Sequence, residues 1–521
     1  MRLSDYTNKD RILAAFVTVL VLILCAMTLT AGLPYWGDDS AAYISEGIAI
    51  ANGSLQKQAE LNYIMHPSEL PEEATPEGLV YVWGYPLVLS GVYNLAGFDR
   101  VNYSSVIWYK IPLLLSLSLL AGVQYLFFRR RFSAGVSAVS SLVLCFSENL
   151  VENLNYLYSD ILFLFFSMLS FLAMELYSEE SKSTGMESRV KKRNLFLGLF
   201  YGAILWYTYE IRLNGITVCI AASVGHAVSL WKSRNQLKRT NILPCLFPYV
   251  VMICLIVVSE QFFLAQATSN MSAMGKAAPE IIGSNIQFYW KQIYNFLNGL
   301  PRIKFKYTGY IFAMACITGI FRKGFSLENL YLTLLLFGTL FINITLSYNQ
   351  GLRYLYNILP IFLMYTVYGL QAAWRRVSSV ISFSGKIRAV IMLCAVCTML
   401  LLPLLNIVSD GIDNRKNWGY TGDGDVYSKE AVDMYRYIRE NVPEDKIIAF
   451  GKPRSLYLNT ERISIRTGCN GHTIADADYY LEYESTYHVF AGEKEEAEAT
   501  PKETIYKNRL FTLYSVNKDR T

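Results

Sequence analysis

Charge is scarce in this sequence of 521 residues. Only 17% of the residues are charged and 53% are hydrophobic, whereas soluble globular proteins usually carry about 25% charged residues. The apolar residues also gather into repeated long runs. Together these features exclude an ordinary soluble domain. The formal net charge of +5 is dispersed over short segments, so it does not indicate a nucleic-acid partner.

The motifs of nucleotide- and metal-driven chemistry are also missing. The sequence has no Walker loop, no HExxH and no GxSxG, and ATP-driven chemistry is therefore not expected. His66 and His472 lie alone in polar loops, so no metal site is predicted, and whether a divalent metal binds stays open. Most of the nine cysteines lie inside apolar runs, where free cysteine behaves as a small hydrophobic residue. No disulfide is predicted.

Long apolar runs dominate what is present. About 20 apolar residues in a helix cross the hydrocarbon core, and in lipid the backbone has to satisfy its own hydrogen bonds. The sequence predicts eleven such spans, with the first too long for a cleaved signal peptide. They are Ile12–Leu33, Val106–Phe128, Ala134–Val151, Ile161–Tyr177, Leu195–Tyr209, Leu213–Trp231, Ile242–Leu264, Tyr307–Phe321, Leu330–Leu346, Leu352–Trp374 and Ile387–Val408.

Lysine and arginine mark one side of this array. Arg129–Arg131, Lys191–Arg193 and Arg375-Arg376 fall in alternate loops, and such loops face the cytoplasm. We predict a cytoplasmic N-terminus and a C-terminus outside. Tyr81–Phe98 is apolar but contains Gly84, Pro86, Gly91 and Gly97, so we interpret it as an interfacial or re-entrant helix. If it spanned the membrane, every later loop would invert.

Two domains follow from this topology. Residues 1–408 form the transmembrane domain, with a first outer loop at 34–105, and residues 409–521 form an extracytoplasmic domain. A smaller outer segment covers about 265–306. In the tail we predict a helix at Val432–Asn441 and strands at Lys446–Phe450, Ser455–Leu458 and Ile505–Val516. The fold class is thus an α-helical polytopic membrane protein with a small α/β C-terminal domain.

Asp38 and Asp39 are the first chemical candidates. They follow the first span directly, and Ser40 is predicted to cap a helix that ends near Asn52-Gly53. Two carboxylates at a helix start also interact favourably with its dipole, which is a purely structural role. Alternatively they supply a general base or metal ligands, because adjacent carboxylates repel and one pKa rises.

Further charged residues lie at the predicted outer ends of later spans. Glu152 and Asp160 flank a short hairpin, where they either cap helices or face the same outer cavity as Asp38. Arg212 and Arg353, the latter beside Tyr354, lie at similar positions. An arginine there snorkels to the interface or binds phosphate through its forked guanidinium.

The ordered set of short motifs resembles the GT-C membrane glycosyltransferases, over most of the chain. The similar subgroup comprises protein mannosyltransferases, aminoarabinose transferases and RgtA/B/C/D-like bacterial enzymes. The matching segments are Asp38-Asp39 with Tyr43, Asn52-Gly53, Trp83-Gly84-Tyr85-Pro86, Tyr158-Ser159-Asp160, Arg212-Leu213-Asn214-Gly215, Arg353-Tyr354 with Pro360, Ala431–Asn441 and Gly451-Lys452-Pro453-Arg454. Asp39 stands where that family usually has Glu, a departure that leaves open which of the two acids is catalytic; the resemblance favours the first position, Asp38.

The resemblance implies inverting sugar transfer on the outer face, from a polyprenyl-phosphate-linked donor to a lipid, glycan or protein acceptor of the cell envelope. The plain loops and the tyrosine-rich composition favour a bacterial source. The resemblance also implies that Asp38 or Asp39 is the general base. The substrate-binding residues would be Tyr43, Glu152, Asp160, Arg212, Arg353 and Tyr354. The alternatives are a transporter or flippase of lipid-linked glycans, which tends to place charge at the bilayer midplane, and a polysaccharide polymerase.

Overall fold

The computed structural model of the chain describes residues 6–34, 36–65, 78–97, 101–181, 188–232, 242–264, 278–299, 307–347, 349, 351–381, 384–418, 422–466, 473–484 and 493–517. Within these ranges a helix lies in each of the eleven predicted spans. Five of these helices contain stretches long and apolar enough to cross a membrane: α1 (Asn8–Met27), α5 (Tyr103–Arg129), α8 (Asp160–Ser181), α10 (Gly215–Lys232) and α16 (Gly385–Lys416). The others are α6 (Ala134–Cys145), α9 (Ser188–Ile211), α11 (Ile242–Ser259), α13 (Thr308–Gly319), α14 (Leu330–Ile344) and α15 (Leu359–Val380). The chain is an α-helical polytopic membrane protein.

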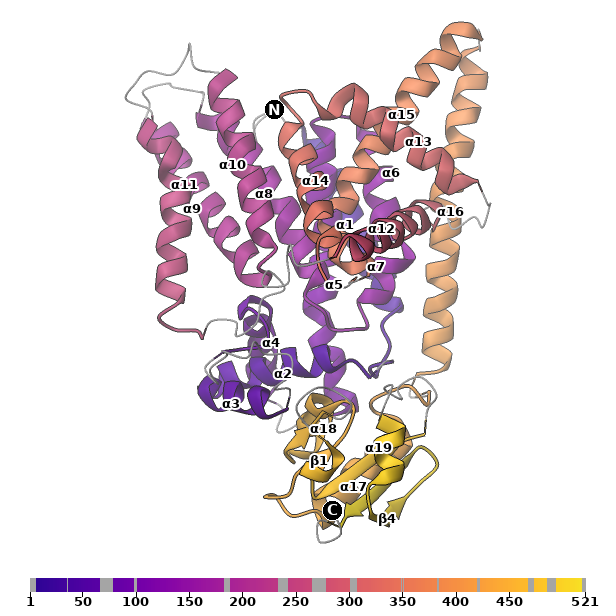
Figure 1. Ribbon diagram of the computed structural model, residues 1–521. Coiled ribbons are helices and arrows are strands. Elements are labelled where there is room, and N and C mark those ends of the chain that lie inside the picture. Colours follow the sequence, from indigo (N-terminus) through magenta and orange to yellow (C-terminus); the bar gives the residue numbers. More distant parts are fainter. Residues whose placement is uncertain are drawn as a thin grey trace.

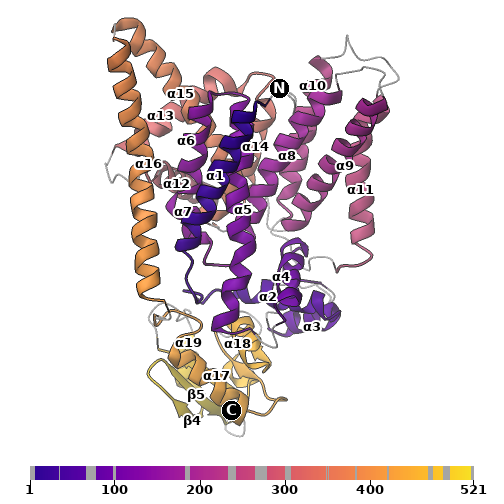
Figure 2. The same ribbon diagram turned by 180° about the vertical axis from the view of Figure 1, so that it is seen from behind.

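The helices form a bundle with two distinct ends. The N-terminus and the start of α1 lie at one end, and the C-terminal α/β domain packs against the other (Figure 1). The reverse view shows the same arrangement, with α16 standing at the edge of the bundle (Figure 2). We call the end that contacts the α/β domain the sheet-facing end.

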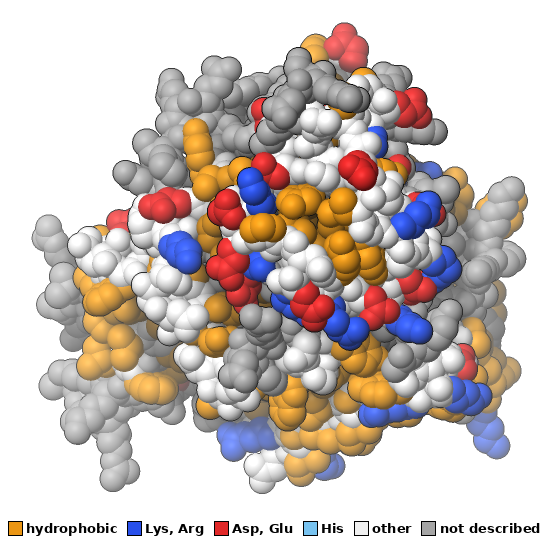
Figure 3. Space-filling view, turned by 90° about the horizontal axis from the view of Figure 1, so that it is seen from below, with side chains coloured by type: hydrophobic (Ala, Val, Ile, Leu, Met, Phe, Trp, Pro, Cys, Tyr) orange, Lys and Arg blue, Asp and Glu red, His pale blue; other side chains and the backbone are white. Residues whose placement is uncertain are grey.

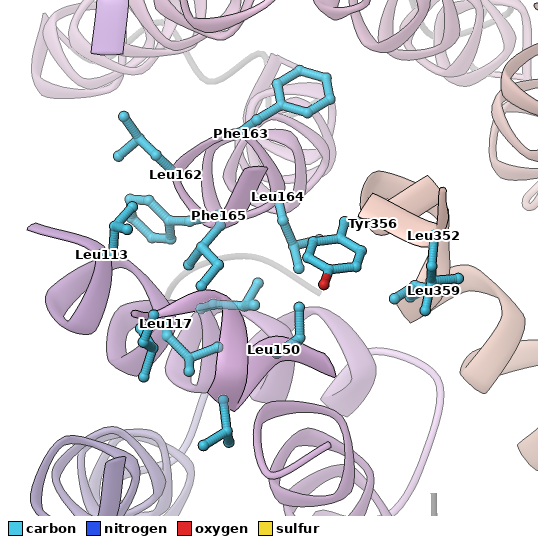
Figure 4. Packing of buried hydrophobic residues seen from close by; sticks show 14 of the residues in the cluster. Leu113, Leu117, Leu150, Leu162, Phe163, Leu164, Phe165, Leu352, Tyr356 and Leu359 are labelled. Atoms are coloured by element: carbon cyan, nitrogen blue, oxygen red, sulfur yellow. The ribbon is translucent and has the colours of Figure 1, made fainter. Parts of the chain in front are cut away.

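The apolar core of the bundle lies between α5, α8 and the segments around them. Leu113 and Leu117 of α5 lie near side chains of α8 and of α7 (Glu148–Asn153), with η6 (Leu352–Ile358) on the far side (Figure 4). Leu113, Leu117 and Leu164 are fully buried. This core fixes the ends of α8 and η6 relative to each other, and both carry candidate residues.

Three predicted spans end five or six residues earlier than expected: the first, the third and the seventh, where α11 ends at Ser259. The first span reaches Leu33 in the prediction, but α1 ends at Met27, and the Thr30 amide donates to Asn155 Oδ1 at 2.9 Å instead of continuing the helix. Buried Lys110 of α5 donates to the carbonyls of Thr30 and Gly32 at 2.8 and 2.6 Å. The third span, predicted to reach Val151, ends with α6 at Cys145, and the short α7 follows it.

Three helices at the sheet-facing end surround the acid pair. They are α2 (Asp38–Ala51), α3 (Leu55–Met65) and α4 (Gly84–Ala96). With 13 residues, α4 is about 20 Å long, and its interfacial placement stays a prediction. The predicted cap at Ser40 is wrong: α2 begins at Asp38, and the Ser40 hydroxyl donates to the Tyr156 carbonyl at 2.6 Å.

The longest helix that the sequence analysis missed is α12; α3 and α19 (Glu493–Ala499) were also not predicted. The outer segment at 265–306 contains α12 (Pro279–Gly299), whose Tyr289, Ile293 and Phe296 are buried while Trp290 is half exposed. The tenth predicted span, from Leu352, also differs. It starts as the tight helix η6, and α15 begins only at Leu359. A π-helical turn, η5 (Ile320–Gly324), follows α13.

The C-terminal domain contains a five-stranded mixed sheet with the order β2-β1-β3-β5-β4. Strand β1 runs parallel to β2 and β3, and β5 runs antiparallel to β3 and β4. The elements are α17 (Lys429–Asn441), β1 (Ile448–Ala449), α18 (Pro453–Thr460), β2 (Ser464–Ile465), η7 (Ile474–Asp476), β3 (Tyr479–Tyr483), α19 (Glu493–Ala499), β4 (Lys502–Lys507) and β5 (Phe511–Val516).

Two strand predictions in the tail are wrong. Ser455–Leu458 belongs to α18, where Pro453 at the helix start favours the helical backbone. The single strand predicted at Ile505–Val516 is a hairpin of β4 and β5. The Asn508 side chain accepts from the amides of Leu510 and Phe511 at 3.0 and 2.8 Å, which turns the chain there.

The domain is attached through the segment that precedes α2. Trp36 is 1% exposed, and its ring contacts four aromatic rings of the domain. They are Tyr435, Phe450, Tyr483 and Phe511, with ring centroids 5.7–6.2 Å away. On the face turned away from the bundle, acidic and basic side chains mingle around an apolar patch (Figure 3).

Candidate active site

A small cleft of about 80 Å³ lies at the sheet-facing end of the bundle. Six of the eight residues predicted as site residues line it: Asp39, Tyr43, Asp160, Arg212, Arg353 and Tyr354. They come from positions scattered over more than 300 residues of the chain. The fold therefore gathers most of the predicted set in one place.

Five of these six side chains are held at or next to the end of a helix, and Tyr43 lies in the second turn of α2. Asp39 is in the first turn of α2, and Asp160 is the first residue of α8. Arg212 directly follows the last residue of α9, and Arg353 with Tyr354 lies in η6. These helix ends meet at one end of the bundle. Their charged side chains therefore lie close together outside its apolar interior.

Two ion pairs cross the cleft. Arg353 Nη2 donates to Asp39 Oδ2 at 2.9 Å, and Arg212 is paired with Asp160. The first pair is open to solvent, with Asp39 and Arg353 side chains 32% and 28% exposed, whereas Asp160 is 2% exposed. The accessible pair is the one that an incoming ligand can contact first.

Aromatic rings support both guanidinium groups. The ring of Tyr354 lies 4.7 Å from Arg212 Cζ and 5.2 Å from Arg353 Cζ. Arg353 also lies 4.5 Å from the ring of Tyr158. Such cation–π contacts hold a guanidinium in place without using its N–H donors. Both arginines are thus positioned with donors available for an anion.

Tyr43 also lines the cleft. Its hydroxyl shares a hydrogen bond of 2.9 Å with Ser159 Oγ, and its ring stacks on Tyr81 at 4.0 Å. Burial raises the pKa of Tyr43 well above its usual value. The phenol therefore remains a neutral hydrogen-bonding group at physiological pH.

The other two predicted residues lie outside the cleft. Asp38 Oδ1 accepts a hydrogen bond from the Ser455 amide at 3.1 Å, in the first turn of α18. Glu152 is exposed on α7 and does not line the cleft. The neighbouring acids Asp38 and Asp39 therefore face different parts of the molecule.

Sequence reasoning missed two contributors to the site. Tyr81 lines the cleft and precedes the Trp83–Pro86 motif, which is the only local signal for it. Glu46 is fully buried on α2 and accepts from the Val80 amide at 2.7 Å, so it holds the segment that carries Tyr81. Burial raises the pKa of Glu46 to about 8.

Two carboxylates, Asp39 and Asp160, line the described cleft. Across the described ranges, no group of three or more His, Cys, Asp or Glu side chains is placed to share one. The two cleft acids are each engaged by a guanidinium. His66 and His472 lie outside the described residues. The positive charge available in the described cleft comes from arginine.

No protein-family model and no curated protein sequence matches the chain. Solved structures do. The apo structure of ArnT from Cupriavidus metallidurans superposes with a TM-score of 0.54 at 12% identity, covering 97% of this chain and 98% of that one. AglB from Archaeoglobus fulgidus, an archaeal oligosaccharyltransferase in complex with an inhibitory peptide and a dolichol-phosphate, gives 0.57 at 10% identity, covering 92% and 70%.

The chain shares its fold with ArnT and AglB, both of which are GT-C glycosyltransferases. The resemblance drawn from the ordered motifs is thereby confirmed at the level of fold. A second ArnT structure, bound to undecaprenyl phosphate, matches over 96% of this chain and 97% of its own length, with a TM-score of 0.51 at 11% identity. The shared fold thus covers both the helical bundle and the C-terminal α/β domain of this chain. At these identities the likeness establishes the fold, and the chemistry has to be argued from the site.

Proposed function

We propose that this protein is a membrane glycosyltransferase that moves a sugar from a polyprenyl-phosphate-linked donor to an acceptor hydroxyl, with inversion. One observation carries the proposal: an accessible carboxylate, Asp39, lies 2.9 Å from Arg353 in a cleft that also holds Arg212. The chemistry needs a base for the acceptor and cations for the leaving phosphate. The lipid phosphates bound to the ArnT and AglB structures support the donor class.

The cleft belongs, in this proposal, to the extracytoplasmic face. Arg129–Arg131 follow α5 at the end of the bundle opposite the cleft, where the positive-inside rule places the cytoplasm. The N-terminus would be cytoplasmic, and the C-terminal domain, which we place after α16, would lie outside. Nucleotide sugars are not expected there, so a lipid-linked donor is the fitting sugar source.

The phosphate of the sugar donor would bind by accepting hydrogen bonds from the N–H groups of the arginine side chains. Arg353 is held between Asp39 and two aromatic rings, so an anion arriving beside it replaces the Asp39 contact. A guanidinium binds phosphate oxygens through two parallel hydrogen bonds. The same exchange releases Asp39, so that donor binding uncovers the base.

Asp39 then accepts the proton of the acceptor hydroxyl. The acceptor oxygen forms its bond to the anomeric carbon as the bond from that carbon to the phosphate oxygen breaks. The charge that develops on the polyprenyl phosphate is stabilised by Arg212 and Arg353. Asp160, buried and paired with Arg212, keeps that arginine in position.

The proposal favours Asp39 over Asp38 as the base, in contrast to the sequence preference. Asp38 is engaged by the Ser455 amide of the C-terminal domain, whereas Asp39 lines the cleft. Asp38 acts here as a positioning residue that ties the start of α2 to α18. Asp38 and Asp39 are adjacent on one helix turn, so the directions of their side chains decide which of them is assigned as the base.

The decisive experiment supplies purified protein with a panel of polyprenyl-phosphate sugars and measures release of the lipid phosphate. We expect one donor to turn over in the presence of its acceptor. Asp39→Asn is expected to lower kcat by about 10²–10⁴-fold, the usual contribution of a general base.

Asp38→Asn is the matched control, because its amide oxygen still accepts from the Ser455 amide. Its kcat should stay within about tenfold of wild type. Full activity of Asp39→Asn, or loss confined to Asp38→Asn, would refute Asp39 as the base. No turnover with any lipid-phosphate donor would refute the proposed function.

A further inference from the structure

A second cavity lies at the sheet-facing end of the bundle, separate from the cleft. Its volume is about 170 Å³, against about 80 Å³ for the cleft. Its walls come from the segment after α1, the start of α5, the end of α16 and the connection from α16 to α17. This end of α16 leads towards the C-terminal domain (Figure 2). The described linings of the cavity and of the cleft share no residue, so the glycosyl-transfer proposal does not use this cavity.

Two aromatic side chains, Tyr103 and Trp418, line the cavity. Trp418 lies two residues beyond the last residue of α16 and is 43% exposed. Arg415 Cζ lies 5.0 Å from the centroid of the Trp418 ring, and Arg415 is not among the described lining residues. This cation–π contact holds the indole from outside the cavity. Trp418 therefore presents a supported aromatic surface to the cavity.

Three side chains with hydrogen-bonding groups complete the wall: Asn414, Asn417 and Asp425. Asn414 Nδ2 donates to the Thr28 carbonyl at 2.8 Å, which fixes the orientation of this amide. Asp425 is 7% exposed, and its Oδ1 accepts from the Tyr427 amide at 2.7 Å. Side-chain amides donate and accept hydrogen bonds, and a carboxylate accepts them. Such a set suits a ligand with several hydroxyl groups, because each hydroxyl also donates and accepts.

The wall formed by the segment after α1 is fixed from inside the bundle. Thr30 and Gly32 line the cavity, and their carbonyls accept from Lys110 at 2.8 and 2.6 Å. A Cβ on Gly32 would clash with the Asp425 carboxylate, so this carboxylate lies against the same segment. Asp425 is the one acidic or basic residue of the described lining, and it interacts electrostatically with Lys110. Because these two groups have opposite charges, the wall favours a neutral polar ligand over an ion.

We propose that this cavity is a second sugar-binding site, which holds one neutral pyranose ring against Trp418 and its hydroxyl groups against the amides and the carboxylate of the lining. A pyranose has a face of C–H groups, which packs on the electron-rich face of an aromatic ring. Its hydroxyl groups need the polar side chains described above. The ring belongs either to a free glycan or to a lipid-linked one. The choice of ligand class follows from the lining and does not depend on the reaction at the cleft.

The test measures saturable binding to the purified full-length protein by calorimetry, in lipid nanodiscs because glycoside detergents would compete. The probes are the methyl and octyl glycosides of glucose, galactose, mannose and N-acetylglucosamine, below their micellar concentrations, with empty nanodiscs as the blank. Binding of methyl glycosides assigns a site for a free glycan, and binding of octyl glycosides alone assigns a site for a lipid-linked sugar. Binding of neither series overturns the proposal. So does binding of octanol or tetramethylammonium as tight as that of the best glycoside.

Trp418→Ala tests the stacking argument. It removes the aromatic surface, so the affinity for the best glycoside should fall at least about tenfold. Trp108→Ala is the matched control, because Trp108 on α5 is 51% exposed and is not in the described lining. Its affinity should stay within about twofold of wild type. Wild-type affinity in Trp418→Ala, or an equal loss in Trp108→Ala, contradicts the assignment.

Gly422→Leu decides the matter if Trp418→Ala does not fold. Gly422 lines the cavity, and a Cβ there would meet nothing within 4 Å, so the added side chain occupies the cavity without removing an aromatic or polar group. Gly91→Leu is its control, because Gly91 is equally open and lies outside the described lining. Retained sugar binding in Gly422→Leu overturns the site. Sugar binding and release of lipid phosphate are separate measurements, so this proposal and the proposed function fail independently.

Discussion

Trp36 is predicted to hold the C-terminal domain against the bundle. It lies between α1 and α2, two residues before Asp38, and its ring is buried among four aromatic rings of the domain. A link of this kind connects the packing of the domain to the start of the helix that carries the acid pair. Trp36→Ala removes the ring and leaves a cavity in its place.

The magnitude follows from burial. Truncating a fully buried Trp to Ala costs about 3–5 kcal/mol, and a loss near 4 kcal/mol raises the population of the opened state by roughly a thousandfold. Trp36→Phe is the matched control. The indole Nε1 is buried without a hydrogen-bond partner among the described residues, so phenylalanine keeps most of the ring contact and removes no hydrogen bond.

The assay is native-state proteolysis of the purified protein, timed by the appearance of the C-terminal fragment. In the regime of fast opening and closing, the cleavage rate tracks the equilibrium population of the open state. We expect a rise of at least about a hundredfold for Trp36→Ala and a small one for Trp36→Phe. A rise below about threefold in Trp36→Ala would show that other contacts hold the domain.

Three further predictions test the surroundings of the cleft. Glu46→Gln should leave the unfolding temperature unchanged, because burial raises the pKa of Glu46 to about 8 and the side chain is already neutral at pH 7. Glu46→Ala should lower the unfolding temperature, because it removes the hydrogen-bond acceptor of the Val80 amide. Gly84→Ala should lower the free energy of unfolding by about 1–3 kcal/mol, because the added Cβ would lie 2.3 Å from the Glu210 carbonyl oxygen. Gly91→Ala on the same helix is the control, because its Cβ would meet nothing within 4 Å and the stability should stay equal or rise. Burial raises the pKa of Asp425 to about 6, so its contribution to stability is largest at low pH and is lost as pH rises through 6; Asp425→Asn should flatten the change in proteolysis rate between about pH 4 and 6.

The sequence by itself determined where the helices lie along the chain better than it determined which residues contact each other. A helix lies in each of the eleven apolar runs of the described chain, because a backbone in lipid has to bond to itself. The same logic placed Asp160, Arg212 and Arg353 at helix ends, where charge leaves the apolar interior. The amphipathic helix α12 was predictable from its spacing of buried residues but lacks a long apolar run.

Tertiary structure decided which residues meet. Successive residues on a helix point about 100° apart, so the start of α2 at Asp38 turns Asp39 into the cleft and Asp38 towards α18. The partner of Asp39 is Arg353, far along the chain. The sequence places Arg130 and Arg131 just beyond the second predicted span. Only the tertiary structure shows that they pack against Glu175 and line a cavity. Local sequence sets how a helix begins and ends; the direction of its side chains depends on the whole bundle.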